Sequence, residues 1–168
     1  MALQALWEAL ETSPVGDFIA SSAWAFPTVE SVHVIAIVTV VATIGIMDMR
    51  LLGWAGKDWT VTEVSDDTLK WTWGAFALAT ITGVLLFVSK AHVYAREPWF
   101  LAKLVLFVIA GANMAVFHHG LAWKHVTEWN AVRTPPRAAI IAGGLSLTIW
   151  VLAIICGRFI GFTLGQYE

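Results

Sequence analysis

Five histidines are the residues of this sequence best suited to hold a haem iron or a metal ion. Two of them, His33 and His92, lie toward the same rim of two successive apolar segments. At a rise of about 1.5 Å per residue, His33 lies roughly 12 Å and His92 roughly 15 Å from the middle of its segment. Two imidazoles at one depth on different helices predict axial ligands that clamp a b-type haem edge-on within a helical bundle.

Charged side chains accompany these two histidines. Glu30 precedes His33 by three residues, so the two share a helix face, and the carboxylate could orient the imidazole through its other ring nitrogen. Lys103 or Arg96 could neutralise the haem propionates. The alternative interpretation is that these residues are ordinary rim side chains that reach toward lipid headgroups.

The same rim could instead bind a transition-metal ion, namely copper, iron or zinc. The ligands would be Glu30, His33 and His92, with Glu97 as a further carboxylate. A glutamate and a histidine three residues apart on a helix are a known form of carboxylate–histidine ligation, but the sequence has one such element within a span.

A second group of histidines follows the third apolar segment. His118 and His119 end it, and His125 shares a face with His118 if the helix continues that far. These residues could hold a second haem with Met47 or Met49 as the sixth ligand. A five-coordinate haem, a quinone pocket or no cofactor are the alternatives at this rim.

Three further polar residues lie within the apolar segments. Asp48 and Arg50 are two residues apart, so they do not face each other on a helix, and we interpret both as structural rim residues with partners elsewhere. Asn113 is expected to form a hydrogen bond between helices.

The elements that position these residues are predicted from composition. The chain has 168 residues, of which 58% are hydrophobic and 13% charged, which indicates an integral membrane protein. Four segments have the roughly 20 apolar residues that a transmembrane helix needs: about 28–50, 72–93, 100–121 and 138–161. The predicted fold class is therefore all-α, an integral membrane four-helix bundle.

The segment before the first span is expected to form short helices. Leu3, Leu6, Trp7 and Leu10 recur at helical spacing, which predicts an N-terminal interfacial amphipathic helix. Pro14 ends it, and a second short helix follows over roughly 15–23. We therefore divide the chain into an N-terminal segment, 1–26, and a transmembrane domain, 27–168.

Basic residues suggest an orientation. We call the rim where the first span starts side A and the opposite rim side B. Six basic residues fall on side B (Arg50, Lys57, Lys70, Lys124, Arg133, Arg137) and four on side A (Lys90, Arg96, Lys103, Arg158). This bias favours a cytoplasmic side B, and hence periplasmic termini, in a bacterial inner membrane. A net charge of −2 with scattered basic residues gives no nucleic-acid footprint.

Three stretches carry a resemblance to a known family. They are "FPTVESVHVIA" leading to "MDMRLLG", then "TGVLLFVS", then "FLAKLVLFVIAGANMAVFHHG". Over nearly the whole chain they resemble small bacterial four-helix membrane proteins known chiefly as a domain of unknown function. The resemblance implies a membrane protein and brings no activity or catalytic residues. In general design the chain is also similar to four-helix membrane cytochromes of the b type.

The leading functional hypothesis is a membrane haem-b electron-transfer protein that exchanges electrons with quinol. A membrane metal-binding protein and a non-catalytic accessory subunit of a membrane complex are the alternatives. The expected partners are the lipid bilayer, quinol, and further copies of the chain in a homo-oligomer or a larger complex. No catalytic motif of a soluble enzyme is recognisable, so an electron carrier or a subunit is favoured over a stand-alone enzyme.

Overall fold

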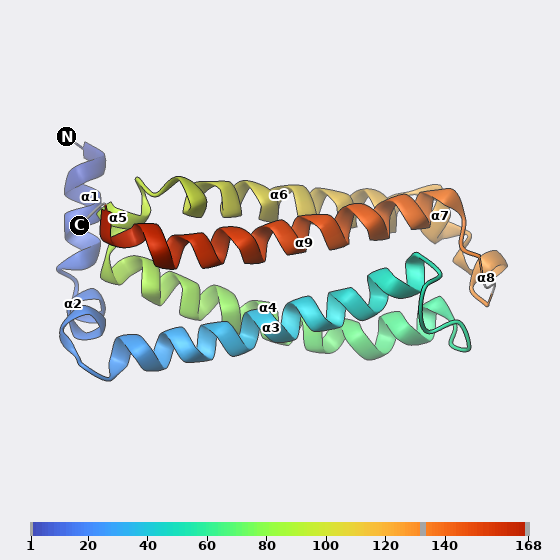
Figure 1. Ribbon diagram of the computed structural model, residues 1–168, viewed down its shortest axis with the longest axis horizontal. Coiled ribbons are helices and arrows are strands. Elements are labelled where there is room, and N and C mark those ends of the chain that lie inside the picture. Colours follow the sequence, from blue (N-terminus) through green and yellow to red (C-terminus); the bar gives the residue numbers. More distant parts are fainter. Residues whose placement is uncertain (1, 132–133, 167–168) are drawn as a thin grey trace.

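Helices form the whole framework of the protein. The computed structural model describes residues 2–131 and 134–166, and there is no strand among them. Four helices are long and apolar enough to cross a membrane: α3 (Ala25–Leu51), α4 (Val61–Ser89), α6 (Pro98–His119) and α9 (Arg137–Thr163). They run along the long axis of the molecule (Figure 1). The all-α class and four apolar helices long enough to cross a membrane are confirmed, as expected for a multi-pass membrane protein.

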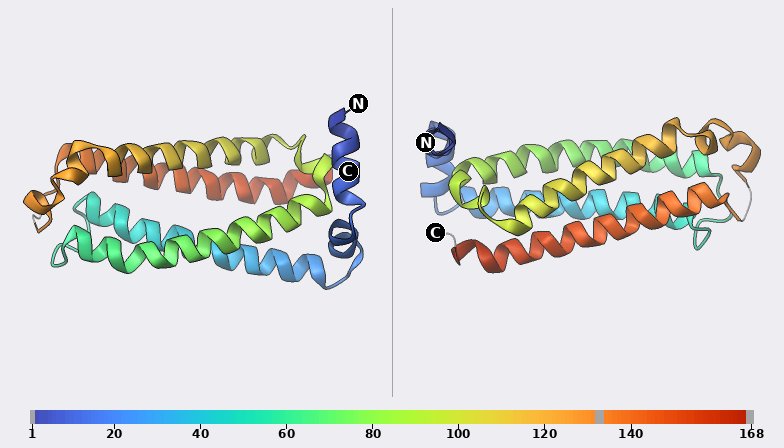
Figure 2. Two further views of the ribbon diagram at one scale, coloured as in Figure 1. Left: turned by 180° about the vertical axis from the view of Figure 1, so that it is seen from behind. Right: turned by 90° about the horizontal axis from the view of Figure 1, so that it is seen from above.

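The four long helices are arranged as two hairpins. Helix α3 packs along α4, α6 packs along α9, and the hairpins meet chiefly where α3 lies against α9. Figure 2 shows the two hairpins from behind and from above. Aromatic rings bridge α4 and α6: the ring centroids of Phe76 and Phe107 are 6.5 Å apart, and those of Phe87 and Phe100 are 5.5 Å apart. Side chains therefore fill much of the space between these two helices.

Local chemistry sets the ends of α4. Thr60 and Glu63 form a capping box, in which each side chain accepts a hydrogen bond from the other's backbone N–H, so the helix starts well before residue 72. It ends at Ser89 because the backbone leaves the helical region at Lys90, where φ is −149° and ψ is 51°. The predicted range of 72–93 was wrong at both ends. His92 consequently lies on a separate short helix, α5 (Ala91–Tyr94).

Helix α6 starts where the sequence predicts it. Glu97 is its N-cap and accepts a hydrogen bond from the backbone N–H of Phe100 at 2.6 Å, and Pro98 occupies the first turn. Glu97 is fully buried, and its second carboxylate oxygen accepts from the Thr163 hydroxyl at 2.7 Å. One oxygen of Glu97 therefore caps α6 and the other joins α6 to α9.

Both ends of the chain lie at side A. Helices α1 (Ala2–Glu11) and α2 (Pro14–Ser21) lie across this end of the bundle (Figure 1). Trp7 of α1 packs edge-to-face on Phe87 of α4, with ring centroids 5.7 Å apart. The two predicted short helices are therefore present, and their position in a membrane interface stays a prediction.

At side B, Arg50 joins the end of α3 to the loops. It is buried, its Nε donates to the carbonyl of Trp59 at 2.9 Å, and its Nη2 donates to the carbonyl of Asn130 at 3.1 Å. The structural interpretation of Arg50 is confirmed. Two short helices, α7 (Leu121–Lys124) and α8 (Val126–Trp129), complete this end. Arg133 lies outside the described residues.

Candidate functional site

His33 lies between α3 and α4 in the side-A half of the bundle. Its ring nitrogen Nδ1 is 2.9 Å from the hydroxyl oxygen of Thr82, which itself donates to the carbonyl of Leu78. The hydroxyl therefore accepts from Nδ1–H, and Nε2 carries the lone pair. A Cβ atom on Gly83 would lie 3.1 Å from the imidazole, so the ring packs directly on the backbone of α4.

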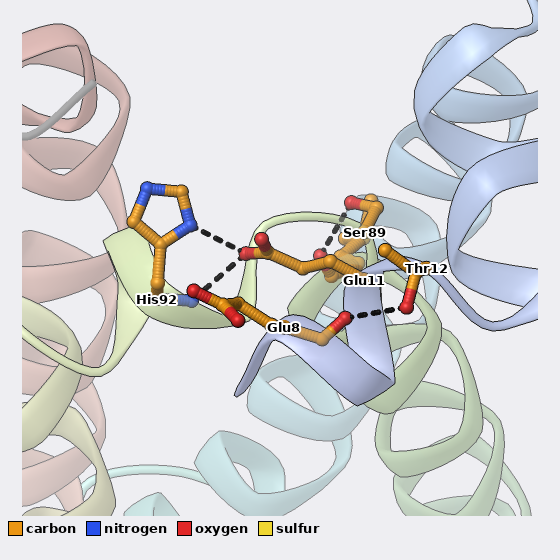
Figure 3. Close-up of polar contacts among 6 residues, drawn as sticks. Glu8, Glu11, Thr12, Ser89 and His92 are labelled. Carbon is orange, nitrogen blue, oxygen red and sulfur yellow. Dashed lines mark hydrogen bonds and ion pairs between the residues drawn. The ribbon is translucent and has the colours of Figure 1, made fainter. Parts of the chain in front are cut away.

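His92 belongs to a different environment. Its Nδ1 lies 2.6 Å from Oε1 of Glu11, and its backbone N–H donates to the same oxygen at 2.9 Å (Figure 3). The imidazole therefore fastens α1 to α5 at the end of the bundle. It borders a shallow recess of about 180 Å³ together with Glu11, Ser89, Lys90 and Val93.

The two imidazoles do not lie at one depth. His33 bonds to Thr82, which is seven residues, or roughly 10 Å, inside the end of α4, whereas His92 lies beyond that end. Their rings face α4 and α1 respectively. The structure therefore does not bring His33 and His92 to the one depth that the sequence predicts.

The remaining side-A residues are dispersed. Glu30 and Arg96 are exposed. Lys103 is partly buried, close enough to His33 to act on it electrostatically, and its Nζ lies 5.6 Å from the centroid of the Phe107 ring. Within residues 2–131 and 134–166, no group of three or more histidine, cysteine, aspartate or glutamate side chains could hold a metal ion.

A cavity of about 190 Å³ lies in the side-B half of the bundle. All four long helices contribute to its wall. Most of its lining is aliphatic or aromatic, and the ring and thioether side chains that border it are Met47, Trp73, Phe76, Phe107, Met114, Phe117, His118 and Trp150. His118 and Met47, both named from the sequence as side-B ligands, are therefore brought to one cavity. His119 is exposed, and Met49 does not line the cavity.

Helix α6 ends before it could carry His125 onto the face of His118. Gly120 closes α6 after His119, and His125 lies between α7 and α8. The sequence predicts that His118 and His125 share a helix face only if the helix continues to His125, and it does not continue that far.

The cavity reaches the outer surface of the bundle between α4 and α6. Leu69 and Trp73 on α4 and Met114 on α6 line it, and they are 39%, 51% and 41% exposed. In a membrane, residues on this outer surface contact lipid. A ligand dissolved in the bilayer would therefore have a lateral route into the cavity.

Asp48 is the buried acidic residue of this cavity. It is 4% exposed and lines the wall from α3, and the carboxyl group interacts with the Ser146 hydroxyl of α9. The oxygen Oδ2 is buried and has no hydrogen-bond partner among the described residues. Buried polar atoms are rarely left without a partner, because the lost hydrogen bond to water is not replaced. Oδ2 of Asp48 is therefore a hydrogen-bond acceptor without a partner among the described residues, and the structural interpretation of Asp48 stays a prediction.

Close packing of α3 on α9 places Asp48 there. A Cβ atom on Gly143 would lie 3.1 Å from the carbonyl oxygen of Asp48 and 3.0 Å from Cβ of Leu51, so a larger residue would require α3 or α9 to shift by a few tenths of an ångström. Asn113 reinforces the wall by donating from Nδ2 to the carbonyl of Ala142 at 3.0 Å. This bond between α6 and α9 confirms the expectation for Asn113.

A sequence signal for the cavity exists on α4. Ser65, Thr68 and Thr72 recur at intervals of three and four residues, so they form a polar stripe on one helix face, and all three line the cavity. The leading prediction was instead a site at side A, because it was based on the positions of His33 and His92. A polar stripe on an apolar helix that faces its partners indicates a site in the bundle interior.

Comparison with known proteins gave no match: no protein-family model, curated protein or solved structure is similar to this chain. The resemblance to the family of unknown function accordingly stays a prediction, and the proposals below rest on the residues of this chain.

Proposed function

We propose that this protein takes part in membrane electron transport by binding the ring of a quinol in its side-B cavity. The observation that carries the proposal is the cavity itself, which all four long helices line and which contains the buried carboxyl group of Asp48. Aromatic and aliphatic walls with a few polar groups are typical of small-molecule sites.

The size of the cavity supports a ligand with one ring. Its volume of about 190 Å³ compares with the roughly 150 Å³ of an engineered protein cavity that binds benzene. Drug-sized ligands need roughly 300–1,000 Å³. A quinol has a ring that could occupy the cavity and an isoprenoid tail that could extend between α4 and α6 into the bilayer.

Purification from bacterial membranes in a mild detergent tests the proposal. Quinones extracted from the purified protein are quantified by mass spectrometry relative to co-purified phospholipid. We expect enrichment over the ratio in the whole membrane. A ratio equal to that of the membrane would contradict quinol binding.

Two glycines provide a matched pair of variants. A Cβ atom on either Gly111 or Gly74 would meet nothing within 4 Å, but only Gly111 borders the cavity. Gly111→Leu should lower the quinone content because the added side chain narrows the cavity, and Gly74→Leu should keep it. Equal losses in both variants would indicate a general defect instead of a blocked site.

Haem b remains a separate proposal with a test of its own. The support for it is that Nδ1 of His33, His92 and His118 is each bonded to an oxygen, so Nε2 is the nitrogen left to ligate iron. Protein from haem-replete cells should then show a Soret band and a pyridine-haemochrome signal. A colourless protein would reject haem b and leave the quinol site to be judged on its own test.

We further propose that the protein lies in the bacterial inner membrane with both termini in the periplasm. Six basic residues at side B against four at side A support this orientation.

A further inference from the structure

We infer that the side-B cavity selects a ligand that donates hydrogen bonds, so that it binds the hydroxyl-bearing quinol in preference to a ring without donors, with Asp48 as the principal acceptor. This inference rests on the proposed function for the identity of the ring. Beyond that function, it specifies that the reduced form, the quinol, is recognised and that Asp48 is the residue that recognises it.

The first step concerns the threonine hydroxyls of the cavity wall, which already donate their hydrogens. Thr43 donates to the carbonyl of Thr39 at 2.9 Å, and Thr68 donates to the carbonyl of Val64 at 2.8 Å. Thr72 donates to the hydroxyl oxygen of Thr43 at 2.8 Å or to the carbonyl of Thr68 at 2.9 Å. A hydroxyl has one hydrogen, so none of these three threonines has a donor left for a ligand. The wall also carries the hydroxyl groups of Ser65 and Ser146 and the ring N–H groups of Trp73 and Trp150, so a preference for a donor ligand has to come from the acceptors His118 and Asp48.

The second step concerns His118. Its Nδ1 lies 3.0 Å from the carbonyl oxygen of Met114, and a carbonyl only accepts hydrogen bonds. Nδ1 therefore carries the hydrogen, and Nε2 of the neutral ring is an acceptor. His118 thus offers a ligand the same kind of group as Asp48 does.

The third step concerns Asp48, whose Oδ2 has no partner among the described residues. The carboxyl group can rotate about its Cβ–Cγ bond, because such torsions are broad, so either oxygen can turn toward the cavity. An isolated carboxyl group within the hydrocarbon region is costly, and a hydrogen bond from a ligand offsets that cost. A ligand hydroxyl is the matching donor.

The fourth step concerns positive charge as the alternative complement. Aromatic rings surround the cavity, and a lipophilic cation could stack on them beside a carboxylate. His118 does not distinguish between the two kinds of ligand. A ligand with hydrogen-bond donors, however, can use both acceptors, Asp48 and His118. The two ligand chemistries are separated by the experiment below.

Binding of three decyl compounds to the purified protein tests the inference. They are decylhydroquinone kept reduced, its dimethyl ether, which has the same ring without donors, and decyltrimethylammonium. We expect the hydroquinone to bind at least about tenfold more tightly than the ether, because the ether cannot donate to Asp48. The ammonium compound should bind more weakly than the hydroquinone.

Asp48→Asn separates hydrogen bonding from shape. The amide keeps the size of the carboxyl group and replaces one acceptor oxygen by a donor, so the hydroquinone preference should fall to about threefold or less. Asp66→Asn makes the same change at an exposed position of α4 and should keep the preference. A preference that survives Asp48→Asn unchanged would show that the methyl groups of the ether are excluded by size.

The outcomes distinguish this inference from the proposed function. Equal binding of hydroquinone and ether to the wild-type protein would overturn donor selection and leave quinone-ring binding in place. Tighter binding of decyltrimethylammonium than of the hydroquinone would overturn it in favour of a cation site. Binding of neither ring compound would remove the proposed function as well.

Discussion

Two acidic residues of this protein have opposite roles because their surroundings differ. Glu97 is fully buried, and both of its oxygens accept hydrogen bonds, one that caps α6 and one that joins α6 to α9. Asp48 is almost as buried, and its Oδ2 has no partner among the described residues. Burial alone therefore does not distinguish a structural acidic residue from one proposed to bind a ligand. The hydrogen bonds of the carboxyl group do distinguish them.

Glu11 is expected to hold α1 on the end of the bundle. Its Oε1 accepts from both the backbone N–H and Nδ1 of His92. Glu11→Ala removes both bonds, so the backbone amides of α1 should exchange with deuterium faster, by roughly fivefold or more, because two bonds worth about 0.5–1.5 kcal/mol each together contribute at least about 1 kcal/mol. Hydrogen–deuterium exchange with mass spectrometry measures this rate.

The neighbouring Glu8 provides the control, because its side chain is exposed on the same helix. Glu8→Ala should leave exchange in α1 unchanged. Similar acceleration in both variants would mean that helix propensity, and not the contact with His92, sets the stability of α1.

Individual residues were only partly predictable from the sequence. The bond of Asn113 across two helices and the structural role of Arg50 follow from a general rule that buried polar groups need partners. The environment of His92 could not be predicted, because it depends on Glu11, which lies 81 residues earlier in the chain. The spacing pattern within one helix contains no information about such a contact.

At the level of helices, the approach of α3 to α9 depends on one glycine. A Cβ atom on Gly143 would lie 3.0 Å from Leu51 and 3.1 Å from the backbone of Asp48, whereas a Cβ atom on Gly144 would lie 3.6 Å from Leu52, which is ordinary contact. Gly143→Ala should therefore destabilise the protein by about 1–3 kcal/mol. Gly144→Ala should be neutral or stabilising by up to about 1 kcal/mol, because alanine favours the helix.

Unfolding in increasing mole fractions of sodium dodecyl sulfate, followed by circular dichroism, compares the two variants. If Gly144→Ala unfolds as readily as Gly143→Ala, close packing is not specific to position 143, which would contradict the account. The same comparison for quinone content should show a loss for Gly143→Ala alone, because Asp48 moves when α9 is displaced.

Helix positions were predictable from apolar composition, but the start of α4 was missed although Thr60 and Glu63 form a capping box there. Helix α6 starts at Pro98, close to the predicted start near residue 100. The end of α4 at Ser89 was missed because the apolar pattern continues into α5 while the backbone changes direction at Lys90. A quinone pocket near His118 and Met47 was one alternative from the sequence, but the rest of the cavity wall was missed, since it is formed by four helices and depends on how the hairpins are arranged.

For the whole molecule, both termini lie at one end of the bundle, as four spans require (Figure 1). In a Cys156→Ala background, single cysteines at Thr12 and Gly165 report on side A, and one at Lys57 reports on side B. With periplasmic termini, a membrane-impermeant maleimide added to intact spheroplasts should label the first two and leave the third unlabelled. The reverse pattern would contradict the proposed orientation, and labelling at both ends would contradict an intact membrane-spanning bundle.

The central claim is that a quinol-type ring occupies the side-B cavity, and photo-crosslinking tests it most directly. A quinone analogue with an azido group on its ring is irradiated with the protein in membranes, and the labelled peptides are identified by mass spectrometry. The account predicts labels on cavity-lining residues of α3, α4, α6 and α9, such as Met47, Phe76, Met114 and Trp150, and competition by decylhydroquinone. Labels confined to residues outside the cavity, or insensitive to the competitor, would contradict it.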